Sequence, residues 1–300
     1  MTAPFPRGRC PLGLCAALAC LLTAAPAPAG DKKDPDKDSP KMILSLSKHG
    51  QFGLMLLDGG EKKRITFGPE GQTNITIVSV DGKMYAFGLD RDAAAGVKLP
   101  PGLLAGKWVK KPAVLKPGIS FEAVWSPVDK VEITQTVEIV RSKTGALDTC
   151  LVRYSVANKD AKAHQVGIRL LLDTLIGEND GHPFALPGKD ELITTSADYK
   201  KDLPAVINAL EKPDLKNPGL VARLSLKVGG GLEAPQRVSL TGFPMGPKDL
   251  VDWEVPVSNI MGDAVVMLYW NPRAVAAGAR RVCGFAYGGG EVALPAKKNK

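Results

Sequence analysis

The sequence predicts an all-β protein: a large antiparallel two-sheet sandwich of the supersandwich type, spanning residues 42–294 as one domain. Two observations support this fold class. From residue 42 onward apolar and polar residues alternate with a period of two, as in strands that bury one face. Glycine, proline, asparagine and aspartate interrupt these runs at short intervals, as in sandwiches with tight turns. Proline-rich loops at 100–102 and 213–218 leave two sandwich subdomains as the alternative.

The first hairpin is predicted around Asp81 and Gly82. These two residues separate the β-rich runs 74–80 and 83–87. An Asp-Gly pair between two such runs favours a two-residue turn, because both central residues of that turn take a positive φ.

The middle of the chain predicts three long strands, 131–139, 149–157 and 164–172. In the first run, Val131 and Ile133 begin a row of apolar residues that alternates with glutamate and threonine. Short turn sequences connect the three runs, so we expect an antiparallel meander of neighbours.

The last third of the chain is broken by glycine and proline and predicts shorter strands, at 220–228, 238–241, 251–257, 264–270 and 282–287. One short helix is predicted at 204–211. Pro204 would occupy its first position, where the missing N–H leaves no helical hydrogen bond unmade.

The first 29 residues have the pattern of a secretory signal peptide. Arg7 and Arg9 precede an apolar run at 12–22, and small residues follow up to Ala29. A basic start, an apolar run and small residues before a cleavage site are typical of exported proteins. The run is shorter than the roughly 20 residues of a transmembrane helix, so no transmembrane segment is expected. The alternative is lipid attachment at Cys20.

After cleavage the protein would lie in the periplasm or outside the cell. Residues 30–41 are charged and poor in apolar side chains, which predicts a flexible leader, and residues 295–300 form a basic tail. The chain has 39 basic and 31 acidic residues, and its net charge of +8 is spread along the sequence. Because no concentrated basic stripe results, we expect no nucleic-acid partner.

Two cysteines lie outside the predicted signal peptide, Cys150 and Cys283. In an exported protein they could form one disulfide. Both also lie in strand-like runs, where a free cysteine behaves as a small buried apolar residue. The sequence leaves both alternatives open.

The segment 173–184 follows a strong strand and concentrates acidic and polar groups. Loops held by rigid strands often carry function. Asp173, Glu178, Asn179 and Asp180 supply the hard oxygen ligands that calcium prefers, so a calcium site is one interpretation. Their spacing differs from that of an EF-hand loop. The alternative is a turn around Asn179 and Asp180 whose acids face water.

The same segment offers candidate catalytic residues. Asp173 with Glu178 or Asp180 could form the carboxylate pair of glycoside chemistry, one as acid and the other as base or nucleophile. His164 or His182 could act as a general base near neutral pH. Acidic pairs are common in exported proteins, so these residues alone do not predict an enzyme.

Aromatic residues gather late in the chain, and Trp253, Tyr269, Trp270 and Tyr287 are the candidate ligand-binding residues. Flat aromatic faces suit sugar rings. Tyr269 and Trp270 are consecutive, so in a strand they point to opposite faces, and one of them would be exposed or cover a second layer. The alternative is that all four belong to the core, as aromatic residues in strands usually do.

Parts of the chain resemble known proteins. The run 154–158 followed by 164–169 resembles the middle of galactose-mutarotase-like, or supersandwich, carbohydrate-associated domains. In these domains a strand that ends in asparagine leads through a short acidic turn to the next strand. The runs 269–272 and 284–288 resemble segments of exported bacterial β-sandwich proteins. The resemblance implies a β-sandwich that is associated with carbohydrates.

The mutarotase family uses paired histidines and a late glutamate. By resemblance, His164 and His182 would be the histidines, and Glu254 or Glu291 the glutamate. The surroundings of both histidines depart from the family pattern. This departure weakens the case for catalysis more than the case for the fold, because one fold carries many functions.

From the sequence we therefore expect an exported, non-catalytic β-sandwich protein that binds carbohydrate or a component of the cell envelope. No cofactor is expected, and calcium is the one candidate. The first alternative is a sugar-active enzyme of mutarotase-like fold, an epimerase or a glycoside-processing enzyme. The second is a structural envelope protein without a ligand.

Overall fold

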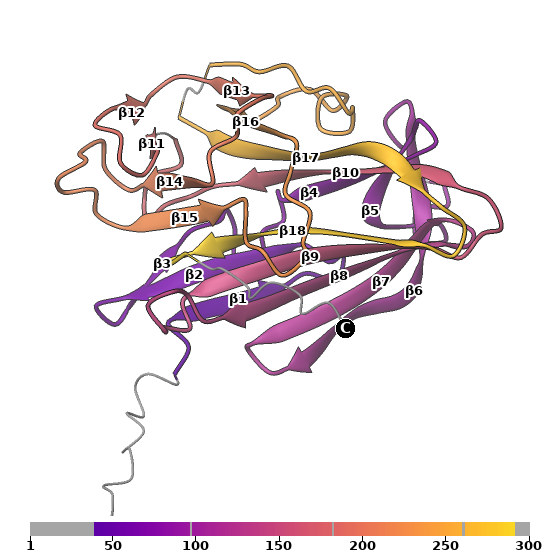
Figure 1. The fold of residues 1–300 in the computed structure, drawn as a ribbon, viewed down its shortest axis with the longest axis horizontal. Coiled ribbons are helices and arrows are strands. Elements are labelled where there is room, and N and C mark those ends of the chain that lie inside the picture. The colour runs from indigo at the N-terminus through magenta and orange to yellow at the C-terminus, as the bar shows by residue number, and fades with distance from the viewer. Residues whose placement is uncertain (1–38, 97, 182, 260–261, 292–300) are drawn as a thin grey trace, which may run out of the picture. The chain divides into compact units, whose positions relative to one another are not determined.

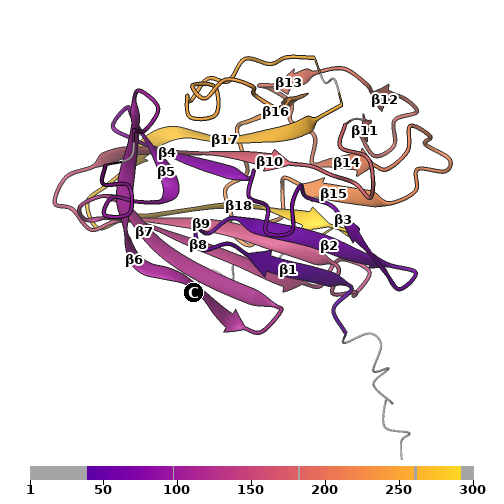
Figure 2. The same cartoon turned by 180° about the vertical axis from the view of Figure 1, so that it is seen from behind.

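The computed structural model describes residues 39–96, 98–181, 183–259 and 262–291, and every regular element in these ranges is a β-strand (Figures 1 and 2). The predicted signal peptide at 1–29, most of the leader and the tail at 295–300 lie outside these ranges and stay predictions. No helix in the described ranges has the length and apolar character needed to cross a membrane.

The described residues form eighteen strands. The first nine are β1 (Met42–Leu46), β2 (Phe52–Asp58), β3 (Glu61–Arg64), β4 (Ile75–Val80), β5 (Lys83–Asp90), β6 (Leu103–Lys116), β7 (Ser120–Val128), β8 (Val131–Val140) and β9 (Thr149–Asn158). The others are β10 (His164–Asp173), β11 (Phe184–Ala185), β12 (Leu192–Ile193), β13 (Ala197–Tyr199), β14 (Val206–Leu210), β15 (Val221–Ser225), β16 (Arg237–Gly242), β17 (Ala264–Val275) and β18 (Arg280–Gly288).

These strands form two sheets. A three-stranded sheet has the order β1-β2-β3, and a fifteen-stranded sheet has the order β12-β11-β14-β15-β18-β9-β8-β7-β6-β5-β4-β10-β17-β16-β13. Neighbouring strands in the described ranges are antiparallel, except for β5 and β6, which run parallel. The predicted all-β antiparallel sandwich is confirmed, with this one parallel pair added.

The long sheet folds back so that two groups of strands face each other (Figure 1). One layer contains β18, β9, β8 and β7, and the other contains β4, β10, β17 and β16. Aromatic side chains of the two layers meet in the core. The ring centre of Trp270 on β17 lies 6.4 Å from that of Tyr154 on β9 and 6.2 Å from that of Phe285 on β18. All three side chains are fully buried.

The predicted period of two is clearest in β8, where buried and half-buried residues alternate over ten positions. Val131, Ile133, Val137 and Ile139 point into the core, as the sequence predicts. The position between Ile133 and Val137 in this inward row is Gln135, which is only 1% exposed. A polar side chain therefore interrupts an otherwise apolar row.

The predicted Asp-Gly hairpin is confirmed. Asp81 and Gly82 have φ values of 51° and 80°, and Val80 of β4 pairs with Lys83 of β5. Both turn residues thus take the left-handed backbone conformation that a two-residue turn requires.

The predicted meander is wrong in its second step. β8 pairs with β9, but β9 then pairs with β18, while β10 pairs with β4 and β17. The chain changes layers between Asn158 and His164. At this corner the side-chain amide of Asn158 donates to the backbone oxygens of Lys162, Val275 and Ala276 at 2.8, 2.9 and 3.1 Å. The bonds to Val275 and Ala276 connect the corner to a segment distant in the sequence. They take the place of the hydrogen bonds that would pair β9 with β10 in a hairpin.

The predicted helix at 204–211 is also wrong, because Val206–Leu210 forms β14 between β11 and β15. Ile207 and Ala209 are buried, whereas Val206 and Asn208 are half-buried, which is the alternation of a strand. The β-branched side chains of Val206 and Ile207 favour a strand. Pairing with two neighbouring strands overrides the weak helix-start signal of Pro204.

The packing of the two layers predicts the effect of truncating Trp270. Replacing Trp270 by Ala removes a fully buried ring that contacts Tyr154 and Phe285. It should lower the free energy of unfolding by about 3–5 kcal/mol in urea titrations. The matched control is Val109→Ala, because Val109 is 56% exposed on β6. Equal effects of the two substitutions would contradict a core position for Trp270.

Candidate functional site

An apolar pocket of about 390 Å³ opens beside the β4–β5 hairpin. Small-ligand sites typically have a volume of this order and mostly apolar walls. The walls come from β4, β5, the turn before β2, the start of β6 and the loop that follows Gly246. Its side chains include Phe52, Ile77, Phe87, Leu99, Leu103 and Leu250 on the apolar side, and Gln51, Asn74, Thr76 and Gln135 on the polar side.

The turn 47–51 forms one rim of this pocket. The hydroxyl of Ser47 accepts hydrogen bonds from the backbone N–H groups of His49 and Gln51, both at 3.1 Å. Close approach of the turn to β5 requires two glycines. A Cβ on Gly50 would lie 2.9 Å from the ring of Phe87, and a Cβ on Gly88 would lie 1.9 Å from the backbone oxygen of His49.

A short chain of polar side chains forms the inner end of the pocket. The amide Nε2 of Gln135 donates to the Tyr154 hydroxyl at 3.2 Å, and that hydroxyl lies 2.9 Å from Oγ1 of Thr76. Burial raises the pKa of Tyr154 to about 12, so its hydroxyl stays protonated. The other end of the amide, Oε1 of Gln135, is buried and has no hydrogen-bond partner. Gln135 thus lines the pocket and keeps one oxygen that is closed to solvent and has no partner.

Few titratable side chains line the pocket. Among the described residues that line it, none is Asp, Glu, Lys or Arg, and His49 is the one titratable side chain. General acid–base catalysis needs a titratable group within hydrogen-bond reach of the reacting atoms. The other polar lining side chains are amides and a hydroxyl, and the Asn74 amide already donates to the Phe52 oxygen and accepts the Asp173 N–H, both at 2.8 Å.

The predicted acidic segment separates into different surroundings. Asp173 ends β10 and is only 2% exposed, and Asp180 lies near it together with Asp263, a residue that the sequence did not single out. Glu178 is exposed and faces a separate cleft with Lys63 and Arg64.

The two remaining candidate residues of this segment are Asn179 and His182. The side chain of Asn179 is engaged locally: its Nδ2 donates to the Leu210 oxygen and its Oδ1 accepts from the Gly181 N–H, both at 3.1 Å. His182 lies outside the described residues.

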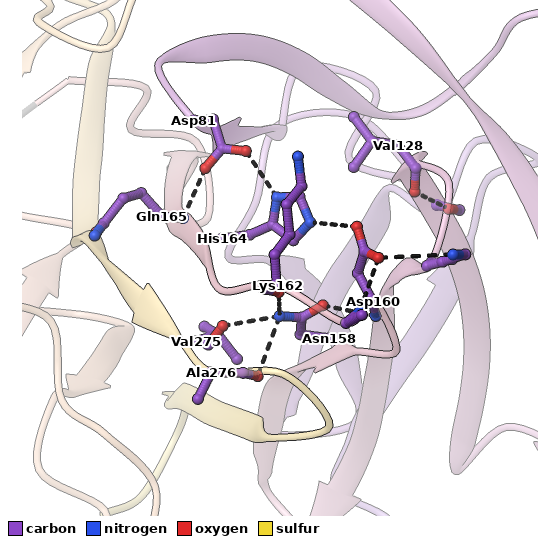
Figure 3. Close-up of polar contacts among 12 residues, drawn as sticks. Asp81, Val128, Asn158, Asp160, Lys162, His164, Gln165, Val275 and Ala276 are labelled. Atoms are coloured by element: carbon purple, nitrogen blue, oxygen red, sulfur yellow. Dashed lines mark hydrogen bonds and ion pairs between the residues drawn. The ribbon is translucent and has the colours of Figure 1, made fainter.

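His164 lies at the opposite end of β10 and is held between two carboxylates (Figure 3). Its Nδ1 lies 2.7 Å from Oδ2 of Asp81, and its Nε2 lies 3.1 Å from Oδ2 of Asp160. The other oxygen of Asp81 accepts the Gln165 N–H at 2.8 Å. Asn158, at the layer-crossing corner, accepts the Asp160 N–H at 2.9 Å. Both ring nitrogens are thus occupied by structural partners.

The candidate aromatic residues mostly belong to the core. Tyr269, Trp270 and Tyr287 are at most 1% exposed, so they present no face to a ligand. Trp253 is half-buried and packs edge-on against Tyr269, with ring centres 6.0 Å apart. Tyr269 and Trp270 do point to opposite faces, but each face is covered: Tyr269 lies in a second apolar cluster with Leu171.

Glu254 and Glu291, the late glutamates of the resemblance, lie in ion pairs. Oε2 of Glu254 is 2.6 Å from Arg237, and Oε2 of Glu291 is 2.6 Å from Lys143. Neither lines the apolar pocket.

The two cysteines are free and buried. They lie on paired strands, β9 and β18, but Cys150 is opposite Tyr287 and Cys283 is opposite Tyr154. Burial raises the pKa of both thiols, that of Cys283 to about 12. The open question of a disulfide is therefore answered in favour of two buried thiols.

The sequence did carry signals for the residues that it left unassigned. Gln135 breaks the inward apolar row of β8, and a polar residue at such a position needs a partner or a role. Asp263 precedes β17 directly, and β17 pairs with β10 so that Val265 lies opposite Asp173. That second signal depends on a strand pairing that the local sequence does not encode.

The His164 geometry predicts a pH dependence of stability. The hydrogen bond with Asp81, followed by that with Asp160, raises the pKa of His164 above its ordinary value. A histidine with a raised pKa stabilises the fold fully below its unfolded pKa of about 6.5 and loses that contribution as the pH rises through the folded pKa. The stability advantage of wild type over His164→Gln should therefore be larger at pH 5.5 than at pH 8.5 in urea titrations.

The control for this prediction is His49→Gln, which alters an exposed histidine in a turn. Comparing the two variants separates the ion pairs of His164 from the general effect of losing a histidine. An advantage of wild type over His164→Gln that is the same at both pH values would contradict the ion-pair geometry.

Comparisons with known proteins find distant likenesses. No family model matches the chain, and no curated protein matches it. A galactose mutarotase related enzyme from Lactobacillus acidophilus has 11% identity and a TM-score of 0.46, with 87% of this chain and 98% of that chain covered. A polysaccharide lyase has 13% identity and a TM-score of 0.44, with 83% and 32% covered.

A protein described as a putative aldose 1-epimerase from Escherichia coli K12 has 12% identity and a TM-score of 0.39, with 82% of this chain and 98% of that chain covered.

Proposed function

We propose that this chain is an exported, non-catalytic binding protein that holds a small carbohydrate in the pocket between β4, β5 and β8. The observation that carries the proposal is the mostly apolar pocket of about 390 Å³, whose lining includes Gln135, a residue with a buried oxygen, Oε1, that lacks a hydrogen-bond partner. Leaving a buried polar atom without a partner costs about 1–3 kcal/mol. A ligand that donates a hydrogen bond there recovers much of this free energy.

The rest of the lining selects for a ligand with two kinds of surface. A sugar ring has an apolar C–H face and a periphery of hydroxyl groups. Phe87 and the aliphatic residues provide an apolar wall, whereas Gln135 is an amide group at the inner end. Because the described lining carries no Asp, Glu, Lys or Arg, a neutral sugar is favoured over a charged one.

The positions of the titratable groups support a role without catalysis. His164 and Asp173 occupy opposite ends of the ten-residue strand β10, which places their backbones about 30 Å apart. A base and an acid so separated cannot act on one small substrate. His164 is also held by Asp81 and Asp160. Export is supported by the signal-peptide pattern of residues 1–29.

The test is a calorimetric titration of the protein with galactose, glucose and mannose and with their phenyl glycosides. We expect saturable binding of at least one of them, with one site per chain. Replacing Gln135 by Leu keeps the approximate volume but removes the acceptor. It should weaken binding about threefold to tenfold, which corresponds to the loss of one hydrogen bond.

The matched control is Gln165→Leu, the same substitution at an exposed position on β10. It should leave the affinity unchanged. The absence of saturable binding by any of the six compounds would contradict a carbohydrate ligand. Equal weakening by Gln135→Leu and Gln165→Leu would contradict the assignment to this pocket.

A further inference from the structure

Three aspartate side chains from three separate segments converge outside the apolar pocket. Asp173 ends β10, Asp180 lies in the following loop, and Asp263 directly precedes β17. One carboxylate oxygen from each lies within 4.8 Å of those of the other two. Side chains of like charge repel, so such a grouping needs a cause.

Backbone hydrogen bonds fix the three segments. The Ala264 N–H donates to the Asp180 oxygen at 2.7 Å, and the Thr174 N–H donates to the Ala264 oxygen at 3.2 Å. The Asp173 N–H donates to Oδ1 of Asn74 at 2.8 Å. The carboxylates are therefore held in place by the fold, and a relaxed loop does not account for their proximity.

The buried oxygens of this cluster lack hydrogen-bond partners. Oδ1 of Asp173, Oδ1 of Asp180 and Oδ1 of Asp263 are each closed to solvent and unpartnered. Asp173 is the extreme case, because the whole residue is only 2% exposed. Buried carboxylates in proteins are normally paired, hydrogen-bonded or bound to a metal ion.

The charges around Asp173 also favour a bound cation. Among the described residues, the charged groups that act on Asp173 are Asp263 and Asp180, both acidic. Burial, opposed by the Thr73 side chain but supported by these two neighbours, raises the pKa of Asp173 to about 7, and burial raises the pKa of Asp180 and of Asp263. A cation at the centre would remove this penalty.

We propose that Asp173, Asp180 and Asp263 form a binding site for a divalent cation, with calcium preferred over magnesium. Carboxylate oxygens are hard ligands of the kind that both ions take, and calcium–oxygen distances are about 2.3–2.6 Å. Two ligands on opposite sides of a calcium ion are thus about 4.8 Å apart, which the separations of the three oxygens allow.

The choice of calcium follows from burial. Magnesium keeps several of its water molecules and demands near-ideal octahedral geometry, whereas calcium accepts irregular sets of protein oxygens. A carboxylate that is as closed to water as Asp173 leaves little room for a hydrated ion. The bound ion would tie the end of β10, its following loop and the start of β17 together.

The cation site and the proposed sugar pocket are separate, although Asn74 lines the pocket and accepts the Asp173 N–H, so the test measures calcium binding and not sugar binding. Chelator-treated full chain is titrated with calcium chloride and, separately, with magnesium chloride at pH 7.5, and the melting temperature is measured with each ion and with chelator. We expect one calcium ion per chain, a rise of several degrees in melting temperature, and magnesium binding at least tenfold weaker.

Asp263→Asn and Asp180→Asn should each weaken calcium binding at least tenfold and abolish the calcium-dependent rise in melting temperature. Asp190→Asn, the same change at an exposed loop position, should retain both properties. Two variants are used because either could perturb folding, and the wild-type titration decides in any case. The absence of calcium binding by wild type, or full calcium binding by both site variants, would overturn the proposal.

Discussion

The side chain of Tyr154 joins the two layers of the sandwich, and the pocket depends on it. Its ring, on β9, packs against Phe87 of β5 and Trp270 of β17, with ring centres 6.2 and 6.4 Å away. Its hydroxyl crosses to the other layer and lies 2.9 Å from Oγ1 of Thr76 on β4. The same hydroxyl accepts the Gln135 amide. One residue thus sets the spacing of the layers and the orientation of the polar end of the pocket.

Buried polar groups in this protein fall into two kinds. Arg281 is only 3% exposed, but its guanidinium lies 2.8–3.0 Å from both carboxylate oxygens of Glu233 and donates to the Asn271 backbone oxygen at 2.9 Å. The side-chain amide of Asn158 similarly donates hydrogen bonds to three backbone oxygens. Such satisfied groups specify the fold. Gln135 and Asp173 instead keep buried oxygens without partners, which is why both sites are assigned to ligands.

The sequence predicted correctly those features that depend on residues close together in the chain. The alternation of β8 and the Asp81-Gly82 turn depend on side-chain period and backbone φ, which a short segment encodes. The neighbours of β9 and β10 depend on which distant strands cover each edge, and the strand at Val206–Leu210 depends on pairing with β11 and β15. Both predictions failed where tertiary contacts decide.

The candidate sites show the same division. Asp173 and Asp180 stand close together in the sequence, so their grouping could be predicted, whereas Asp263 joins them only through the pairing of β10 with β17. Trp270 and Tyr287 were candidates because aromatic rings suit sugars, but the core uses the same rings for packing. The inward position of Gln135 follows from the alternation of β8, but its missing partner is visible only when β4 and β9 are placed beside it.

The most direct test of the link between the layers is a double-mutant cycle on Tyr154→Phe and Thr76→Val. Each change removes one hydroxyl of the buried pair and keeps the shape of the side chain. If the hydroxyls join the layers, the effects on the free energy of unfolding should be non-additive by about 0.5–1.5 kcal/mol. Additivity within about 0.3 kcal/mol would show that the two hydroxyls do not interact. It would contradict the claim that Tyr154 links the layers and orients the polar end of the pocket.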